Sequence, residues 1–383
     1  MSTTPRQHYR ELDEYERFWL ACEPWLKEKG YLFRPRYRPG WVPSWNFNPE
    51  DEYNWIRAED AQVRNTVRFM DAERVKDGDI VYFKRLHSTS THEIAMIRLL
   101  ASEPFAADPR NHCVPCYSIL NVPDTIAKDN ILVEMPFLTD WFSPEFETVG
   151  EVLEFFRQTL EGLHHMHSHH IAHNDIKANN ILMDHSPLYD VPPHPIMPIK
   201  SRDWSRPVEP SNRTDRPVHY YIIDFDLSVQ YGPKDGPHLR EPWYGGDRSV
   251  PEFERDEMCD PFAVDVYRMG NIFKGCFTVG DWDDDLWPQL RGLEFMNELI
   301  NDMTDPDPKK RPKMDEVMER FTKIRKSLSW HQLRGPVWKA KDPIPAVGSR
   351  PWLSHWRKQM RRIVRHVPAL PTPKPIARPK LSQ

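Results

Sequence analysis

A short stretch of the chain carries a carboxylate, an ammonium group and an amide at a spacing suited to phosphoryl transfer. Asp175 is followed two residues later by Lys177 and five residues later by Asn180. A carboxylate can align an acceptor hydroxyl, an ammonium group can face the moving phosphoryl group, and an amide oxygen can ligate Mg²⁺. Farther along, the apolar run 221–223 ends at Asp224, as a strand that presents a metal-binding carboxylate would. These four residues predict a site that moves a phosphoryl group with the help of a divalent cation.

Around this stretch, several motifs stand in the order typical of the protein kinase superfamily, which the chain resembles over roughly residues 61–325. The motifs that carry the resemblance are Val81-Tyr82-Phe83-Lys84, Val133-Glu134-Met135, His173-Asn174-Asp175, Asp224-Phe225-Asp226, Val250-Pro251-Glu252, residues 265–270 and Arg311. In the same order, they resemble these features of the family: the Val-Ala-Ile-Lys strand, the hinge, His-Arg-Asp, Asp-Phe-Gly, Ala-Pro-Glu, Asp-x-Trp-x-x-Gly and a late arginine. In the family, that arginine pairs with the glutamate of Ala-Pro-Glu.

The resemblance implies a nucleotide site in the amino-terminal half of this region. Lys84 would hold the α- and β-phosphates of ATP, and a helical glutamate would orient it. We assign that glutamate as Glu93 rather than Glu103, because Pro104 disfavours helical geometry at the residue before it. The residues expected to contact the nucleotide are Lys84, Tyr82, Glu134, Met135 and Leu182. Of these, Glu134 and Met135 belong to the hinge, which in the family reads adenine with backbone groups.

The resemblance also assigns roles in the transfer step. Asp175 would act as the base, and Lys177 would face the γ-phosphate of ATP. Asn180 and Asp224 would bind Mg²⁺, which is the expected cofactor together with ATP.

The order of the sequence patterns predicts an α+β fold with two unequal lobes that position these residues. Strand patterns come first and helical patterns come later. The N-lobe is expected at about 61–136 and the C-lobe at about 137–325. In the N-lobe, strands are expected at 66–75 and 80–86, joined in a hairpin by a turn at Asp77-Gly78. A helix is expected at 91–102 and a further strand at 131–135. In the C-lobe, Thr148 and Glu151 form the pattern of a capping box that opens a long helix.

Three segments lie outside this core. Residues 1–60 form an N-terminal extension with a helical stretch at 11–29. Residues 185–217 hold eight prolines between two strand-like runs and are expected to be an insert without a core of its own. Residues 326–383 form a basic, proline-rich tail with an amphipathic helix at about 351–367.

Charge is unevenly distributed along the chain. The net charge is −5, but residues 341–383 carry ten Lys/Arg and one acid, so the tail contributes +9 and the rest −14. The tail helix is therefore expected to dock on its own acidic body or on a protein partner. Nucleic acid is not expected as a stable partner, and a membrane surface is a minor alternative.

Localisation is expected to be cytoplasmic, with the nucleus as an alternative. The amino terminus is polar and charged rather than a secretory signal, and no apolar run is long enough to span a membrane. The five cysteines are scattered, as is usual in a reducing compartment.

Four departures from the family pattern bear on nucleotide binding and regulation. No glycine-rich loop precedes Lys84, since residues 61–70 contain no glycine. Tyr82 stands where the family has a small alanine against adenine, and its ring would partly fill that space. Asp226 replaces a glycine, and Asn174 replaces the arginine that grips a phosphorylated activation segment in many kinases. Phosphorylation of that segment is therefore not expected to be the switch.

The expected activity is that of an ATP- and Mg²⁺-dependent protein kinase of Ser/Thr type, because Lys177 stands two residues after the catalytic aspartate. The alternative is a pseudokinase that serves as a protein-binding scaffold, since the departures weaken nucleotide binding. A small-molecule phosphotransferase is disfavoured, because Glu252, Gly270 and Arg311 match the C-lobe of protein kinases. Under either leading hypothesis the partner is a protein.

Overall fold

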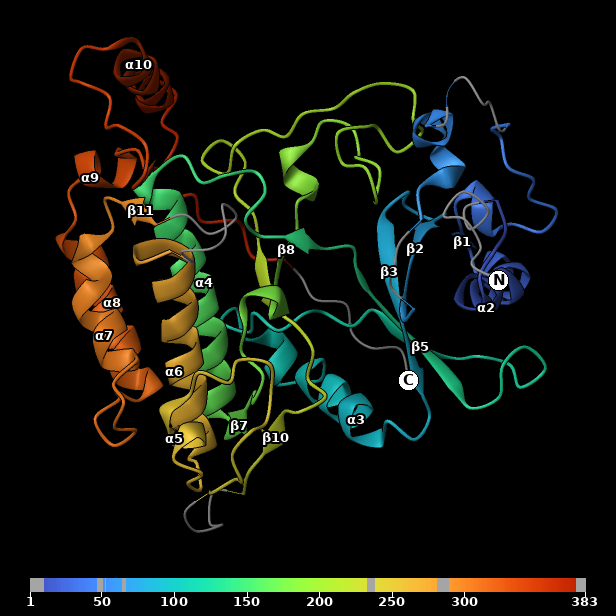
Figure 1. Ribbon diagram of the computed structural model, residues 1–383, viewed down its shortest axis with the longest axis horizontal. Helices are drawn as coiled ribbons and strands as arrows, with labels where there is room; N and C mark the ends of the chain where they lie inside the picture. The colour runs from blue at the N-terminus through green and yellow to red at the C-terminus, as the bar shows by residue number, and fades with distance from the viewer. Residues whose placement is uncertain are drawn as a thin grey trace.

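A five-stranded antiparallel sheet forms the small lobe of the computed structural model, which describes residues 10–46, 51, 53–63, 67–232, 238–280 and 289–376 (Figure 1). The strand order is β1-β2-β3-β5-β4. The strands are β1 (Tyr31–Leu32), β2 (Phe69–Arg74), β3 (Ile80–His87), β4 (Ser118–Asn121) and β5 (Asn130–Pro136). The expected hairpin forms between β2 and β3, and its turn contains Gly78 at φ 74°. A left-handed residue in so short a turn favours glycine.

The two faces of this sheet have different partners because side chains alternate along a strand. Val81 and Phe83 of β3 are buried in a cluster with Trp19 and Leu26 of helix α2 (Glu14–Glu28). Tyr82 and Lys84 therefore point to the opposite face, toward the large lobe. Residues assigned to an N-terminal extension thus supply both a strand and a covering helix to the small lobe.

The large lobe is helical and is organised around α4 (Val149–Ser168) (Figure 1). The other helices are α5 (Pro251–Glu254), α6 (Pro261–Phe273), α7 (Asn297–Met303), α8 (Met314–Ser327), α9 (Trp330–Arg334) and α10 (Arg350–Val364). Rings of α4 and α6 form part of the core, with Phe156 and Phe273 centred 4.1 Å apart. One half of the expected capping box forms: Thr148 Oγ1 accepts from the Glu151 amide, while the Glu151 carboxylate accepts from the amides of Glu147 and Thr214.

Short strand pairs in the large lobe hold the loops that carry the polar residues. They are β6 (Thr139–Asp140), β8 (Ile181–Met183) and β9 (Tyr220–Ile222) in one sheet, β7 (Ile171–Ala172) with β10 (Val229–Gln230), and β11 (Leu290–Arg291) with β12 (Trp338–Lys339). The helix α3 (Thr91–Leu100) lies between this region and the small-lobe sheet (Figure 1). The expected α+β class, with the sheet first and the helices later, is confirmed.

The proline-rich insert between β8 and β9 reaches the small lobe. His194 Nε2 lies 3.0 Å from Glu59 Oε1, and Trp204 Nε1 donates to the Arg57 carbonyl oxygen at 2.8 Å. Arg202 Nε pairs with Glu73 Oε2 on β2 at 3.2 Å. The insert therefore ties the two lobes together through polar contacts, although it has no large apolar core of its own.

The basic tail helix α10 docks on the acidic large lobe. Lys358 Nζ lies 2.6 Å from Glu147 Oε1, and Arg362 Nη2 lies 2.9 Å from Asp215 Oδ2. Arg362 is 2% exposed, so its charge is compensated by the body and not by solvent. Among the described helices, none combines the length and the apolar composition that a membrane span requires.

Candidate active site

Lys84 lies at the centre of the candidate site and contacts both lobes. Its Nζ donates to Glu93 Oε1 at 2.6 Å and to Asp224 Oδ1 at 2.8 Å. Lys84 comes from β3, Glu93 from the first turn of α3, and Asp224 from the loop after β9. Glu103, the other candidate for the helical glutamate, lies beyond the end of α3 and is exposed. The structure thus brings together the lysine and the two carboxylates that sequence analysis grouped.

Mutual attraction keeps this lysine and its aspartate partner ionised. Burial alone would lower the pKa of Lys84, but Glu93 and Asp224 outweigh burial, and the pKa is raised. Burial likewise disfavours the carboxylate form of Asp224, yet the Lys84 ammonium lowers the pKa of that carboxyl. Asp224 therefore offers a full negative charge at neutral pH.

The backbone around Asp224 is tied to the loop that contains Asp175. Asp224 has φ 69°, a left-handed conformation that aspartate tolerates better than most residues. The Ile223 amide donates to the Asn180 carbonyl oxygen at 2.9 Å, and His173 Nε2 lies 3.0 Å from the Ile223 carbonyl oxygen. The buried ring of Phe225 lies 5.7 Å from that of His173, so the two side chains pack together beneath the loop.

Asp175 is 4% exposed and has partners at both carboxylate oxygens. Lys177 Nζ lies 2.7 Å from its Oδ2, and Asn180 Nδ2 donates to the same oxygen at 2.9 Å. The amide of Gly246 donates to Oδ1 at 2.6 Å. These contacts hold the carboxylate in one orientation, as a group that must align a hydroxyl requires.

A buried carboxylate under the loop supports this geometry. Asp265 of α6 is 0% exposed and accepts from the amides of His173 at 2.7 Å and Asn174 at 2.9 Å. Asn174 has φ 66°, so the chain turns sharply just before Asp175. The Asp-x-Trp-x-x-Gly resemblance pointed to Asp265 from sequence alone.

Sequence analysis missed two residues that hold the segment after residue 243. Arg268 is 0% exposed and donates to the carbonyl oxygens of Asn174, Tyr244 and Asp247. A Cβ at Gly245 would lie 2.6 Å from the Asn174 oxygen and 2.7 Å from the Arg268 guanidinium, so the close approach requires glycine. The Gly245-Gly246 pair was the one signal available in the sequence. That phosphorylation of this segment is not the switch stays a prediction.

The donor set suits Mg²⁺. Asp224 and Asn180 line the same cavity, and their donor atoms are oxygens, which Mg²⁺ prefers. Asn180 donates through its Nδ2 to Asp175, which leaves its amide oxygen for a cation. Two protein ligands are enough for this ion, because waters and phosphate oxygens usually supply the others.

An aromatic wall narrows the site where adenine was expected. The Tyr82 ring stacks on Phe69 with centroids 5.2 Å apart and meets Phe137 edge-on at 5.5 Å. Beyond this wall, the cavity that contains Lys84, Glu93, Asn180 and Asp224 has a volume of about 210 Å³. Small-molecule sites usually measure about 300–1,000 Å³. The cavity in this conformation therefore has room for phosphate groups but not for a whole nucleotide.

Of the other residues expected to contact the nucleotide, one lines the cavity and two do not. Met135 lines the cavity, whereas Leu182 is half-buried in β8 outside its lining. The Glu134 side chain lies on the opposite face of the sheet, where Ser118 Oγ donates to it at 2.6 Å and Arg74 Nη1 pairs with it at 3.2 Å. Its carbonyl oxygen accepts from the Tyr117 amide. Residues 64–66, in the stretch where the family has its glycine-rich loop, lie outside the described residues.

The chain is similar to known proteins over its central part. Residues 132–278 match the protein kinase domain family. Probable serine/threonine-protein kinase ireA of Dictyostelium discoideum is 26% identical over 199 residues, which cover 48% of this chain and 17% of that protein. MAP kinase kinase kinase wis4 of Schizosaccharomyces pombe is 26% identical over 179 residues, which cover 42% of this chain and 11% of that protein. The chain thus spans less than a fifth of the length of these relatives.

Proposed function

From the premise that this chain belongs to the protein kinase superfamily, we propose that it transfers the γ-phosphoryl group of ATP to a serine or threonine hydroxyl of a protein. One observation carries the proposal: Lys84 contacts Glu93 and Asp224 at 2.6 and 2.8 Å. The family match begins at residue 132, so Lys84 and Glu93 lie outside it. Their meeting with Asp224 therefore supports the proposal independently of that match.

Each polar residue has a defined task in this proposal. Lys84 orients the α- and β-phosphates, Asp175 aligns the acceptor hydroxyl, and Lys177 stabilises the charge of the moving phosphoryl group. Asn180 and Asp224 would hold Mg²⁺, which neutralises the phosphate oxygens when it is bound. Lys177 contacts Asp175 at 2.7 Å, so its ammonium stands next to the group that aligns the nucleophile.

A second candidate function rests on the aromatic wall. If Tyr82 keeps its place against Phe69 and Phe137, adenine has no room, and the domain acts as a protein-binding scaffold. We favour the kinase, because a scaffold has little chemical reason to hold Lys84, Asp175 and Asp224 in this arrangement. The wall then requires Tyr82 to swing away when the nucleotide binds.

Replacement of Tyr82 with alanine is expected to tighten Mg·ATP binding by roughly tenfold. Moving a ring out of a filled space costs about 1–3 kcal/mol, and about 1.4 kcal/mol corresponds to a tenfold change in affinity. The measurement is a titration of Mg·ATP followed by thermal unfolding, since a ligand at 100 times its Kd stabilises the fold by about 2.7 kcal/mol. Tyr15→Ala is a matched control, because Tyr15 is 49% exposed on α2.

Asp224→Ala distinguishes specific binding from general stabilisation by salt or phosphate. The shift caused by Mg·ATP should disappear in this variant, both alone and combined with Tyr82→Ala. If neither the native chain nor Tyr82→Ala binds Mg·ATP, the kinase proposal fails and the scaffold function takes its place.

A further inference from the structure

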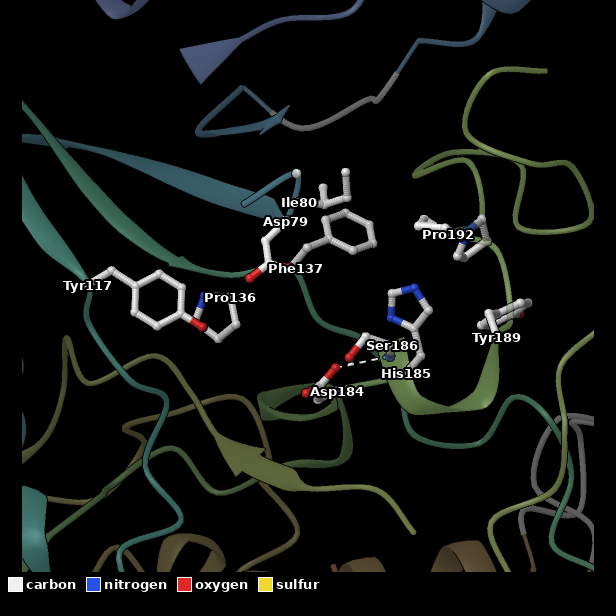
Figure 2. Close-up of a pocket in the computed structure, with 12 residues that line it drawn as sticks. Asp79, Ile80, Tyr117, Pro136, Phe137, Asp184, His185, Ser186, Tyr189 and Pro192 are labelled. Carbon is white, nitrogen blue, oxygen red and sulfur yellow. Dashed lines mark hydrogen bonds between the residues drawn. The ribbon is translucent and has the colours of Figure 1, made fainter. Parts of the chain in front are cut away.

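A second cavity of about 190 Å³ lies between the hinge, the β2–β3 turn and the proline-rich insert (Figure 2). It shares no lining residue with the cavity at Lys84. It is smaller than most small-molecule sites, which usually measure about 300–1,000 Å³. Its size therefore suits one side chain or one small head group.

Aromatic rings form much of its lining. Figure 2 shows the ring of His185 between Phe137 and Tyr189, with Tyr117 on the far side of the cavity. The centroid of His185 lies 5.5 Å from that of Phe137 and 5.6 Å from that of Tyr189. Such rings attract a cation placed over their faces.

The charge at the cavity is negative. Asp79 and Asp184 line it, and no lysine or arginine of the described residues does. Asp184 accepts from the Ser186 amide at 3.0 Å, and no lysine or arginine among the described residues forms an ion pair with it. Asp79 lies 3.1 Å from Arg74, but that guanidinium also pairs with Asp77 and Glu134. One positive charge is thus shared among three carboxylates.

His185 adds an unused hydrogen-bonding group. It is 7% exposed, and its Nδ1 has no hydrogen-bond partner among the described residues. Burial lowers the pKa of His185, so the ring is neutral near pH 7 and does not oppose a cation. Burial also raises the pKa of Tyr117 to about 12, with Asp184 contributing, so its hydroxyl stays neutral as well.

We propose that this cavity binds a guanidinium group, with the carboxylates of Asp184 and Asp79 as acceptors and the rings of Tyr189 and Phe137 as stacking partners. A guanidinium is flat, always charged and more weakly hydrated than an ammonium, and it presents five N–H donors. These properties match a narrow aromatic cavity with several acceptors better than a compact ammonium does. The group is supplied by an arginine side chain of a peptide or by a free guanidine compound. The site uses none of the residues proposed for phosphoryl transfer, so its test does not depend on kinase activity.

Ligand-observed NMR titrations of the full chain at low salt test the proposal on the unmodified protein. N-ethylguanidinium is expected to bind saturably and at least tenfold more tightly than N-ethylurea, its neutral counterpart of similar shape. Acetyl-glycyl-arginyl-glycinamide is compared in the same way with its citrulline analogue. Tighter binding of the arginine peptide than of N-ethylguanidinium identifies a peptide as the source, and equal affinity identifies a free guanidine compound. Equal affinity for the charged and neutral members of both pairs overturns the proposal.

Substitutions at the cavity then locate the binding. Asp184→Asn should weaken guanidinium binding roughly 10- to 100-fold, because hydrogen bonds to a charged group are the strong ones. Tyr189→Ala should weaken it about threefold through the lost ring. Asp190→Asn is the matched control, since Asp190 belongs to the same insert, is 83% exposed and does not line the cavity. Unchanged affinity in both Asp184→Asn and Tyr189→Ala would place the ligand elsewhere and refute the site.

Discussion

Asp175→Asn is expected to reduce phosphoryl transfer by roughly 10²- to 10⁴-fold while nucleotide binding persists, the range typical for loss of a general base. The amide oxygen of asparagine can still accept from Gly246, whose amide lies 2.6 Å from Oδ1 in the native site, so the loop should keep its shape. The substitution removes the negative charge that faces Lys177 and can no longer take a proton from the acceptor hydroxyl. Transfer of radiolabel from ATP to casein and to the chain itself measures the effect.

Two comparisons make this experiment decisive. Asp190→Asn makes the same chemical change at an exposed position and should transfer at the native rate. Thermal unfolding with and without Mg·ATP should give the same shift for Asp175→Asn as for the native chain, because Asp175 is not among the residues that line the cavity at Lys84. Native transfer rates in Asp175→Asn would rule out this carboxylate as the base.

Arg311→Met is expected to destabilise the fold by about 3–5 kcal/mol, the typical cost of leaving one member of a buried ion pair alone. Arg311 Nη1 and Nη2 donate to the two carboxylate oxygens of Glu252 at 2.8 and 2.5 Å, and the side chains are only 0% and 2% exposed. Without the guanidinium, the Glu252 carboxylate stays buried without its charged partner. Urea unfolding followed by tryptophan fluorescence should show a lower midpoint at an unchanged slope.

A double substitution separates the ion pair from general damage to the core. Arg311→Met combined with Glu252→Leu removes both charges and should recover part of the lost stability, because no uncompensated charge remains. Arg320→Met is the surface control: its partners Asp302, Glu298 and Glu316 are 46%, 89% and 57% exposed, and a loss of at most about 1 kcal/mol is expected. If the double variant were no more stable than Arg311→Met alone, the pair would not be the cause.

Local patterns in the sequence were enough to predict β2, β3, β5 and α3 of the small lobe, but not β1 and β4. The Asp77-Gly78 turn between two β-rich runs predicted the hairpin of β2 and β3, and α3 begins at Thr91 as expected. The loop around Asp175 could be predicted in the same way, since Lys177 and Asn180 lie within five residues of the aspartate. Such features can be predicted from sequence because turn conformation and side-chain periodicity depend on residues only a few positions apart.

The tertiary structure decided which distant residues meet. Lys84 and Asp224 are 140 positions apart, and nothing in either local sequence states that their side chains touch. The direction of Glu134 away from the cleft followed from the register of β5 in the sheet, where a shift of one residue reverses every side chain. The hinge motif alone could not reveal that register.

Packing also decided what fills the site and what surrounds it. Tyr82 was recognised as an obstacle from sequence, but its stacking on Phe69 and its edge contact with Phe137 depend on three separate segments. The contacts of the insert also depend on distant segments, because its prolines indicated an irregular segment and not a bridge between lobes. The contacts of Arg268 depend on distant segments in the same way. The sequence by itself determined which chemical groups are present and the local shape that carries them. Their meeting required the whole chain, because contacts between distant segments form only when the fold buries its apolar surface in one arrangement.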